Sequence, residues 1–208
     1  MSVMQRSRIK ICGLRRVEDI EAVNRYLPDY AGFIIDFPKS HRSLSLDKVQ
    51  ALTEILDRQR IKAVGVFVDA AISKVADALN CGMIDMAQLH GTEDAQYIRR
   101  LRNMTDGKII KAFTVRSAED VNRALESEAD HILLDQGQGS GRTFDWSILG
   151  ERLTGREWFL AGGISQDNIA EAIRRLHPFA VDLSSAVETD KLKDPEKIRK
   201  IINIVRNC

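Results

Sequence analysis

Residues 8–13, Arg-Ile-Lys-Ile-Cys-Gly, form an apolar strand pattern that ends in a cysteine and a glycine and runs directly into a helical pattern. Because side chains alternate across a strand, Lys10 and Cys12 project to one face and Ile9 and Ile11 to the other. In a central strand of an α/β protein, an inward-facing lysine needs a partner. Cys12 is therefore a candidate functional residue at the C-terminal end of a strand. The structural alternative is a packed cysteine beside a lysine whose amine reaches solvent.

The same order of elements recurs along the chain: an apolar run, a polar or glycine turn, and a helical pattern. Strands are expected to begin near Arg8, Tyr30, Lys62, Ile84, Lys108, Asp130, Glu157 and Phe179. Apolar residues at helical spacing predict helices over 17–26, 46–58, 72–79, 94–104, 118–126, 146–153, 168–176 and 195–205. Alternating elements predict parallel strands with crossover helices, and eight such units can close into a (β/α)8 TIM barrel. The expected fold is thus one compact α/β barrel domain over residues 1–208, with a doubly wound open sheet as the alternative.

Composition narrows the function classes. The chain has 208 residues, 44% hydrophobic and 29% charged, as in a soluble globular protein. A net charge of +1, without a basic cluster interleaved with aromatics, gives no reason to expect nucleic acid as a partner. The N-terminal segment lacks the apolar core of a signal peptide and no long apolar run follows, so we expect a cytoplasmic protein with no membrane contact. Cys12, Cys81 and Cys208 lack CxxC spacing and are interpreted as free thiols, with no metal site.

If the barrel closes, the C-terminal ends of its strands carry the chemistry. The seventh and eighth strands end in small residues beside helix starts, where backbone N–H groups can bind phosphate: Gly162, Gly163, Ser184 and Ser185. Gly141, in the glycine-rich loop after the sixth strand, adds further N–H groups. A small phosphorylated substrate is therefore predicted, with plain tight turns as the alternative for the glycines. No dinucleotide or P-loop motif follows a strand, so no nucleotide cofactor is expected.

Seven motifs in order then carry a resemblance to a known family. They are Lys10-Ile-Cys-Gly13 with Glu18-Asp19, Gly32-Phe33 with Ser40-His41-Arg42, residues 64–68, residues 88–91, Gly139-Ser140-Gly141 with Phe144-Asp145-Trp146, residues 160–163, and residues 182–188. Together they resemble phosphoribosylanthranilate isomerase over nearly the whole chain. The resemblance implies a cofactor-free barrel of tryptophan biosynthesis. Its reaction is the Amadori rearrangement of N-(5-phosphoribosyl)anthranilate to 1-(2-carboxyphenylamino)-1-deoxyribulose 5-phosphate.

By this resemblance Cys12 is the general base and Asp135 the general acid. The reaction needs an acid to protonate the furanose ring oxygen and a base to take the C2 proton. Lys10, on the same strand face as the thiol, would favour the thiolate. Arg42, in the family's Ser-x-Arg motif, is expected to hold the anthranilate carboxylate, with an ordinary surface arginine as the alternative.

The remaining candidates follow by strand parity and motif. Asp182 should face the barrel interior beside the first strand as the counter-charge of Lys10. Gln88 and His90 share one strand face and either line the substrate pocket or pack behind it. The resemblance also places Gly141, Gly162, Gly163, Ser184 and Ser185 in the phosphate cradle.

Some positions depart from the family pattern. Ala186 stands where glycine is usual, Ser140 where threonine is, His41 where proline is frequent, and Lys191 near a common glycine. One alternative function is another phosphate-binding barrel isomerase or lyase of histidine or tryptophan biosynthesis, but those sites typically use carboxylates at the first and fifth strands. The other alternative is a catalytically silent barrel that binds a phosphorylated metabolite. Either a monomer or a homodimer is expected.

Overall fold

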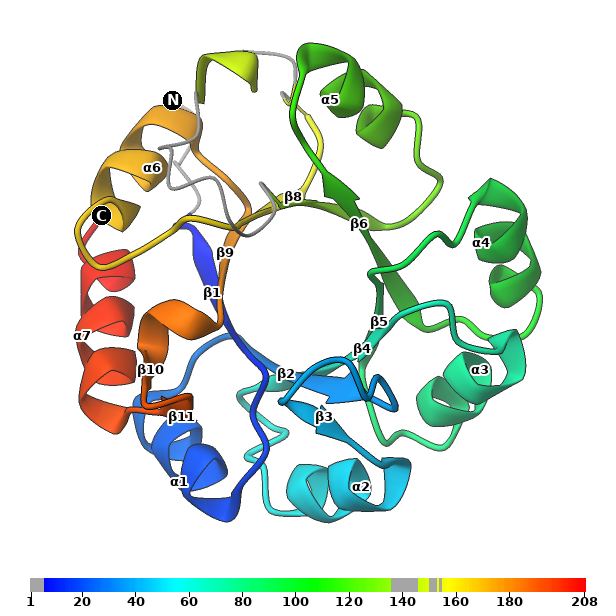
Figure 1. Ribbon diagram of the computed structural model, residues 1–208, viewed down its shortest axis with the longest axis horizontal. Helices are drawn as coiled ribbons and strands as arrows, with labels where there is room; N and C mark the ends of the chain where they lie inside the picture. Colours follow the sequence, from blue (N-terminus) through cyan, green and yellow to red (C-terminus); the bar gives the residue numbers. More distant parts are fainter. Residues whose placement is uncertain (1–5, 136–145, 150–152, 154) are drawn as a thin grey trace.

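A closed ring of eight parallel strands forms the centre of the protein. The computed structural model describes residues 6–135, 146–149, 153 and 155–208. The ring strands are β1 (Arg8–Cys12), β2 (Tyr30–Ile35), β4 (Lys62–Phe67), β5 (Met86–Leu89), β6 (Lys108–Thr114), β7 (His131–Asp135), β8 (Trp158–Ala161) and β9 (Ala180–Leu183). Because β1 pairs in parallel with both β2 and β9, the sheet closes, as Figure 1 shows down the barrel axis. The predicted barrel is therefore confirmed and the open sheet is wrong.

Helices surround the ring of strands (Figure 1). They are α1 (Val17–Tyr26), α2 (Leu46–Glu54), α3 (Ile72–Asn80), α4 (Ala95–Arg102), α5 (Ala118–Leu125), α6 (Ile169–Leu176) and α7 (Pro195–Arg206). Helix α5 begins with a capping box of Ser117 and Asp120, and at the start of α7 the Asp194 carboxylate accepts from the backbone N–H groups of Glu196 and Lys197. None of the helices in the described ranges is long and apolar enough to cross a membrane.

The end of α2 differs from the prediction because a side chain of α1 binds the backbone there. Helix α2 ends at Glu54 and not at Arg58. Asn24 binds the chain just beyond that end, donating to Ile55 O at 2.8 Å and accepting from Asp57 N at 2.9 Å. Helix α6 begins at Ile169 with Asn168 as its N-cap and ends at Leu176, which agrees with the predicted range 168–176. At α2 the Asn24 amide supplies the donor and the acceptor that a continuing helix would otherwise use.

The sixth unit departs most from the expected repeat. In its described residues the predicted helix 146–153 contains the 3-10 turn η1 (Trp146–Ile148). Leu149 N donates to Trp146 O at 3.1 Å, which is the shorter hydrogen-bond spacing of that turn. The Arg175 guanidinium of α6 lies 5.3 Å from the Trp146 ring centroid, so this turn packs against α6.

The core has two layers. Alternate strand residues fill the barrel interior, among them Tyr30, Val64, Met86, Ile110, Leu133 and Phe159. The opposite faces of the strands pack against the helices in a larger apolar layer. Since the interior is filled by side chains, ligands are expected at the ends of the barrel and not through it.

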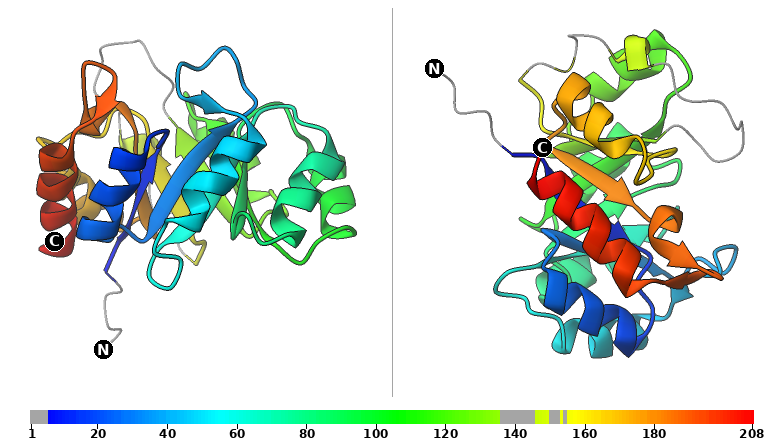
Figure 2. Two further views of the ribbon diagram at one scale, coloured as in Figure 1. Left: turned by 90° about the horizontal axis from the view of Figure 1, so that it is seen from below. Right: turned by 90° about the vertical axis from the view of Figure 1, so that its left-hand side faces the viewer.

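Two short additions stand over the C-terminal ends of the strands. Strand β3 (Ser43–Leu44) pairs with β2, and β10 (Glu188–Thr189) pairs with β11 (Leu192–Lys193) as a hairpin after the 3-10 turn η3 (Ser185–Val187). In the left view of Figure 2 both segments rise on the same side of the barrel, opposite the N-terminus. The chain thus builds one rim from the segments that follow β2 and β9.

Candidate active site

Cys12 is the last residue of β1 and lies beside a buried ion pair. Lys10 Nζ is 3.0 Å from both carboxylate oxygens of Asp182, and the Lys10 side chain is fully buried. The counter-charge predicted for Lys10 is therefore present. Burial raises the pKa of the Cys12 thiol, and the nearby Lys10 ammonium acts in the opposite direction by favouring the thiolate. Lys10 itself is kept charged, because Asp182 and Cys12 outweigh the lowering of its pKa by burial.

Gly32 makes room for the thiol. It lies opposite Cys12 in the β1–β2 pairing, and a Cβ there would be 2.8 Å from Cys12 Sγ and 3.1 Å from Lys10 Cε. A side chain at this position would therefore displace both the thiol and the lysine. This requirement was not predicted from the sequence, where Gly32 entered only as part of a motif.

Arg42 lies across the residue that follows the thiol. Gly13 has a φ of 79°, and a Cβ there would collide with Arg42 Cδ. The guanidinium donates from Nε and Nη2 to the two carboxylate oxygens of Glu188, both at 2.7 Å. These side chains are 12% and 7% exposed, so Arg42 is not an ordinary surface arginine.

Glu188 and Lys193 are further polar residues of this cluster that sequence reasoning missed. Lys193 Nζ donates to Glu188 Oε1 at 2.7 Å and to Ser184 O at 2.9 Å. The Arg42 and Lys193 partners bring the pKa of Glu188 to about 2, against the opposing effect of burial. Glu188 was visible as the last residue of a motif, but its partner Arg42 is too distant in sequence for spacing to reveal the pair.

Asp135, the last residue of β7, lies near two of the other predicted residues. His90 Nε2 is 3.6 Å from Asp135 Oδ2, and the Gln88 amide nitrogen is 2.8 Å from His90 Nδ1. When Nδ1 accepts from this amide, a neutral His90 carries its proton on Nε2, which faces Asp135. The structure therefore places His90 beside the carboxyl and Gln88 behind His90.

The loops after β8 and β9 lie on neighbouring strands. Gly162 and Gly163 have φ of 76° and 62°, which explains why glycine stands there. Ser184 Oγ donates to Cys12 O at 3.1 Å, so it ties β9 to β1, while Ser185 is exposed at the start of η3. Ala186 has no positive φ and accommodates its Cβ without strain. Gly141 and Ser140 lie outside the described residues.

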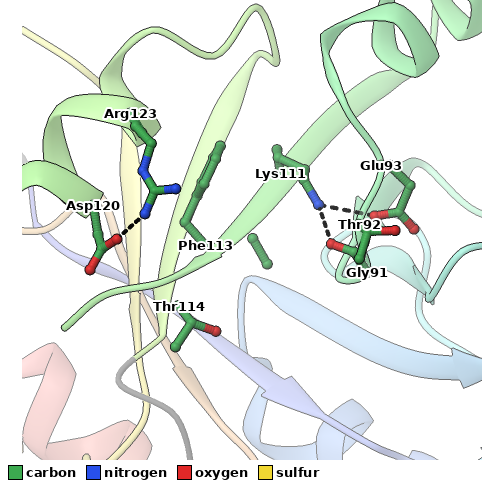
Figure 3. Close-up of a pocket in the computed structure, with 9 residues that line it drawn as sticks. Gly91, Thr92, Glu93, Lys111, Phe113, Thr114, Asp120 and Arg123 are labelled. Atoms are coloured by element: carbon green, nitrogen blue, oxygen red, sulfur yellow. Dashed lines mark hydrogen bonds and ion pairs between the residues drawn. The ribbon is translucent and has the colours of Figure 1, made fainter.

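A cavity of about 310 Å³ opens beside the ends of β5 and β6 (Figure 3). None of the predicted site residues lines it. The Lys111 ammonium, which Figure 3 shows between Gly91 and Glu93, donates to Gly91 O at 2.7 Å and to Glu93 Oε2 at 3.0 Å. Its charge is thus already neutralised by a buried partner.

The arrangement supports acid–base chemistry at one end of the barrel. A thiol beside a lysine ends β1 and a carboxyl beside a histidine ends β7, and the C-terminal ends of all eight parallel strands share one rim. Within the described ranges, no three His, Cys, Asp or Glu side chains are placed to share a metal ion. The Cys12 thiol and the Asp135 carboxyl are groups that can exchange protons with a ligand.

Comparison with known proteins agrees with the family resemblance seen in the sequence motifs, over nearly the whole chain. Residues 9–204 match the family model described as N-(5'phosphoribosyl)anthranilate (PRA) isomerase. An N-(5'-phosphoribosyl)anthranilate isomerase of Clostridium kluyveri is 43% identical over 201 residues, covering 96% of this chain and 98% of the relative.

Solved structures agree with the sequence match. Phosphoribosyl anthranilate isomerase from Thermotoga maritima is 34% identical, with a TM-score of 0.85 over 97% of this chain and 100% of that one. A second structure, the isomerase in complex with reduced 1-(o-carboxyphenylamino)-1-deoxyribulose 5-phosphate, has 34% identity and a TM-score of 0.83 over the same shares. The chain belongs to the phosphoribosylanthranilate isomerase family.

Proposed function

We propose that the protein is an N-(5'-phosphoribosyl)anthranilate isomerase of tryptophan biosynthesis, with Asp135 as general acid and Cys12 as general base. The observation that carries the assignment is the placement of this carboxyl and this thiol at the C-terminal ends of β7 and β1 in a closed barrel of that family. The reaction moves protons within one molecule and needs no cofactor. We further propose a cytoplasmic protein, either a monomer or a homodimer.

The acid step opens the ribose ring. Asp135 gives its proton to the furanose ring oxygen, the C1–O bond breaks, and the anilino nitrogen lone pair forms an iminium with C1. The nearby His90 supports this role, because an Nε2–H that faces the carboxylate would stabilise it once the proton has left.

The base step forms the product. The Cys12 thiolate takes the C2 proton, and the C2–H electrons form an enolamine that tautomerises to the ketone. The raised pKa of the thiol makes its thiolate a stronger base, while the Lys10 ammonium preserves a population of that thiolate. We therefore expect kcat/KM to rise with pH as the thiolate forms.

Binding groups are proposed at both ends of the substrate. The Arg42 guanidinium, planar and permanently charged, suits the anthranilate carboxylate. The loops with Gly162, Gly163, Ser184 and Ser185 lie after neighbouring strands, and with Gly141 they are proposed to bind the phosphate. Gln88, His90 and Asp182 are proposed to line the pocket between these two ends.

The test is the loss of phosphoribosylanthranilate fluorescence as substrate is consumed. Cys12→Ala and Asp135→Asn should each lower kcat by roughly 100-fold or more, which is the usual contribution of one acid or base. Cys81→Ala is the matched control because its thiol is exposed and lies after α3, away from the rim. Circular dichroism confirms that each variant folds.

The competing functions predict other outcomes. A silent barrel would bind the reduced product analogue by calorimetry while wild type leaves the fluorescence unchanged. A different barrel isomerase would not turn over this substrate either. Near-normal turnover by folded Cys12→Ala or Asp135→Asn would remove the assigned role of that residue.

A further inference from the structure

We propose that Glu188 is a positioning residue for substrate recognition: it holds the Arg42 guanidinium by one edge and so presents the other edge to the aromatic carboxylate of the substrate. This inference deepens the proposed function and rests on it, because it takes Arg42 as the group that binds this carboxylate. The Arg42–Glu188 pair itself is an observed feature of the structure.

The geometry is that of a fixed fork. A guanidinium has five N–H groups in one plane, and Glu188 accepts two of them, from Nε and Nη2, at 2.7 Å each. The guanidinium has a second edge, formed by Nη1 and the other N–H of Nη2. This edge lies in the same plane but faces a different direction from the edge that Glu188 binds. A second carboxylate can therefore bind end-on without displacing Glu188. The Arg42 side chain crosses closely over Gly13, the residue that follows the thiol.

Glu188 is itself held from two directions. Its Oε1 accepts from Lys193 Nζ at 2.7 Å, and its backbone oxygen accepts from Lys197 Nζ at 2.6 Å. Lys193 lies directly opposite Glu188 in the β10–β11 pairing, and its side chain is 1% exposed. The hairpin after β9 thus fixes the carboxylate before any ligand arrives, and this reduces the ordering that binding would otherwise require.

The charges of the cluster favour one further anion. Arg42 and Lys193 both pair with the single carboxylate of Glu188, while the neighbouring Lys10 and Asp182 neutralise each other. Lys197, which donates to the Glu188 backbone oxygen, adds a further positive charge, so the cluster keeps an excess of positive charge. A substrate carboxylate would balance it, and a neutral group at the same position would not.

The experiment measures binding of two ligands to Glu188→Gln. One is the reduced product analogue that carries the carboxylate, and the other is the same compound without it. We expect Glu188→Gln to lower the affinity for the carboxylated ligand about 10-fold and to leave the affinity for the decarboxylated ligand within twofold. The same variant should raise KM for substrate while kcat stays within twofold of wild type. Asp130→Asn is the matched control: Asp130 also joins an arginine and a lysine, Arg102 and Lys108, but lies before β7 at the other end of the barrel.

A double-mutant cycle shows whether Glu188 acts through Arg42. Arg42→Ala should lower the affinity for the carboxylated ligand, and adding Glu188→Gln to this variant should lower it no further. If Arg42→Ala leaves this affinity unchanged, the proposed role of Arg42 fails and the inference fails with it. If Arg42→Ala has a large effect and Glu188→Gln has none, or Glu188→Gln weakens both ligands equally, the inference alone is overturned. Should Glu188→Gln not fold, Glu188→Asp carries the same prediction, because it keeps the charge but withdraws the carboxylate from the guanidinium.

Discussion

At the residue scale, the thiol of Cys12 is governed by two opposite charges that neutralise each other. Lys10 lowers the pKa of the thiol and Asp182 raises it, in addition to the larger raising effect of burial. Lys10 alone would lower the pKa of the thiol, and the thiolate would then be a weaker base. With Asp182 present the thiolate stays a strong base, and Lys10 still allows some of the thiol to ionise. The ion pair therefore tunes the base as well as neutralising a buried charge.

This arrangement predicts that removing the charge of Lys10 and removing the charge of Asp182 shift the pKa of Cys12 in opposite directions. Asp182→Asn should lower the pKa of Cys12, because Lys10 then acts on the thiolate unopposed, and Lys10→Met should raise it. Thiolate ultraviolet absorbance against pH, in a background with Cys81→Ser and Cys208→Ser, measures both shifts. Each variant should also lose about 3–5 kcal/mol of unfolding free energy, because one buried charge loses its partner.

The double variant, Lys10→Met with Asp182→Asn, is the control. It removes both charges, so it should recover part of the lost stability. If both single variants move the thiol pKa in the same direction, general loosening of the core would explain the data better than the two charges do.

At the element scale, the β10–β11 hairpin fixes Glu188 and Lys193 with a two-residue turn made without glycine. Asp190 and Lys191 have φ of 51° and 62°, as the central residues of primed hairpin turns do. A side chain in this left-handed region costs about 1–2 kcal/mol, less for aspartate than for lysine. Glycine adopts this left-handed conformation without a steric cost, whereas the Lys191 side chain makes it strained.

Lys191→Gly should therefore stabilise the protein. Relief of the left-handed conformation outweighs the added freedom of the unfolded chain, for a net gain of about 0.5–1 kcal/mol. Urea unfolding measures the gain. Asn103→Gly is the contrasting variant, since Asn103 ends α4 with a φ of −74° and a glycine there should only destabilise. A loss of stability in Lys191→Gly would show that the exposed Lys191 side chain contributes more than its backbone costs.

Elements also show how far sequence reasoning reached. Strand and helix order followed from apolar periodicity, because each βα unit must bury one strand and one helix face. The end of α2 did not follow, since Asn24, which is distant in sequence, binds the backbone at Ile55. The 3-10 turn at Trp146–Ile148 was also missed, because apolar spacing alone does not separate a short 3-10 turn from the start of an α-helix.

In the candidate site, too, some contacts could be predicted from the sequence and others could not. Lys10 with Asp182 was predictable, because strand parity and barrel closure place both side chains in the interior of adjacent strands. The contacts of Gln88 with His90 and of His90 with Asp135 required coordinates. So did Glu188, because its partner Arg42 comes from a loop on the other side of β1, where no periodic pattern constrains the chain.

At the scale of the whole molecule, the two ends of the barrel have different composition. The candidate catalytic groups Cys12 and Asp135 lie at the C-terminal ends of the strands, whereas an aromatic cluster fills the N-terminal end. In that cluster His131 stacks on Phe179 with ring centroids 5.2 Å apart, and Phe159 lies 5.4 Å from Tyr30. Barrels commonly separate chemistry from stability in this way. Changes in the aromatic cluster should therefore affect unfolding and leave kcat unchanged.

His131 makes this end of the barrel sensitive to pH. Burial lowers its pKa below the ordinary value, although the Glu157 carboxylate 3.4 Å away acts in the opposite direction. Because the unfolded chain then binds the proton more readily than the folded one, this contribution to stability is complete above about pH 6.5 and is lost as the pH falls toward the folded-state pKa.

His131→Phe should flatten this dependence. The ring keeps its stacking on Phe179 but has no proton to bind, so Tm should fall less between pH 7 and pH 5 than in wild type. His177→Asn is the control: it removes an exposed histidine at the end of α6 and should leave the wild-type slope. Parallel Tm curves for wild type and His131→Phe would mean that other groups set the acid sensitivity. An unchanged kcat in His131→Phe would confirm that this end stabilises the barrel while the opposite rim carries the chemistry.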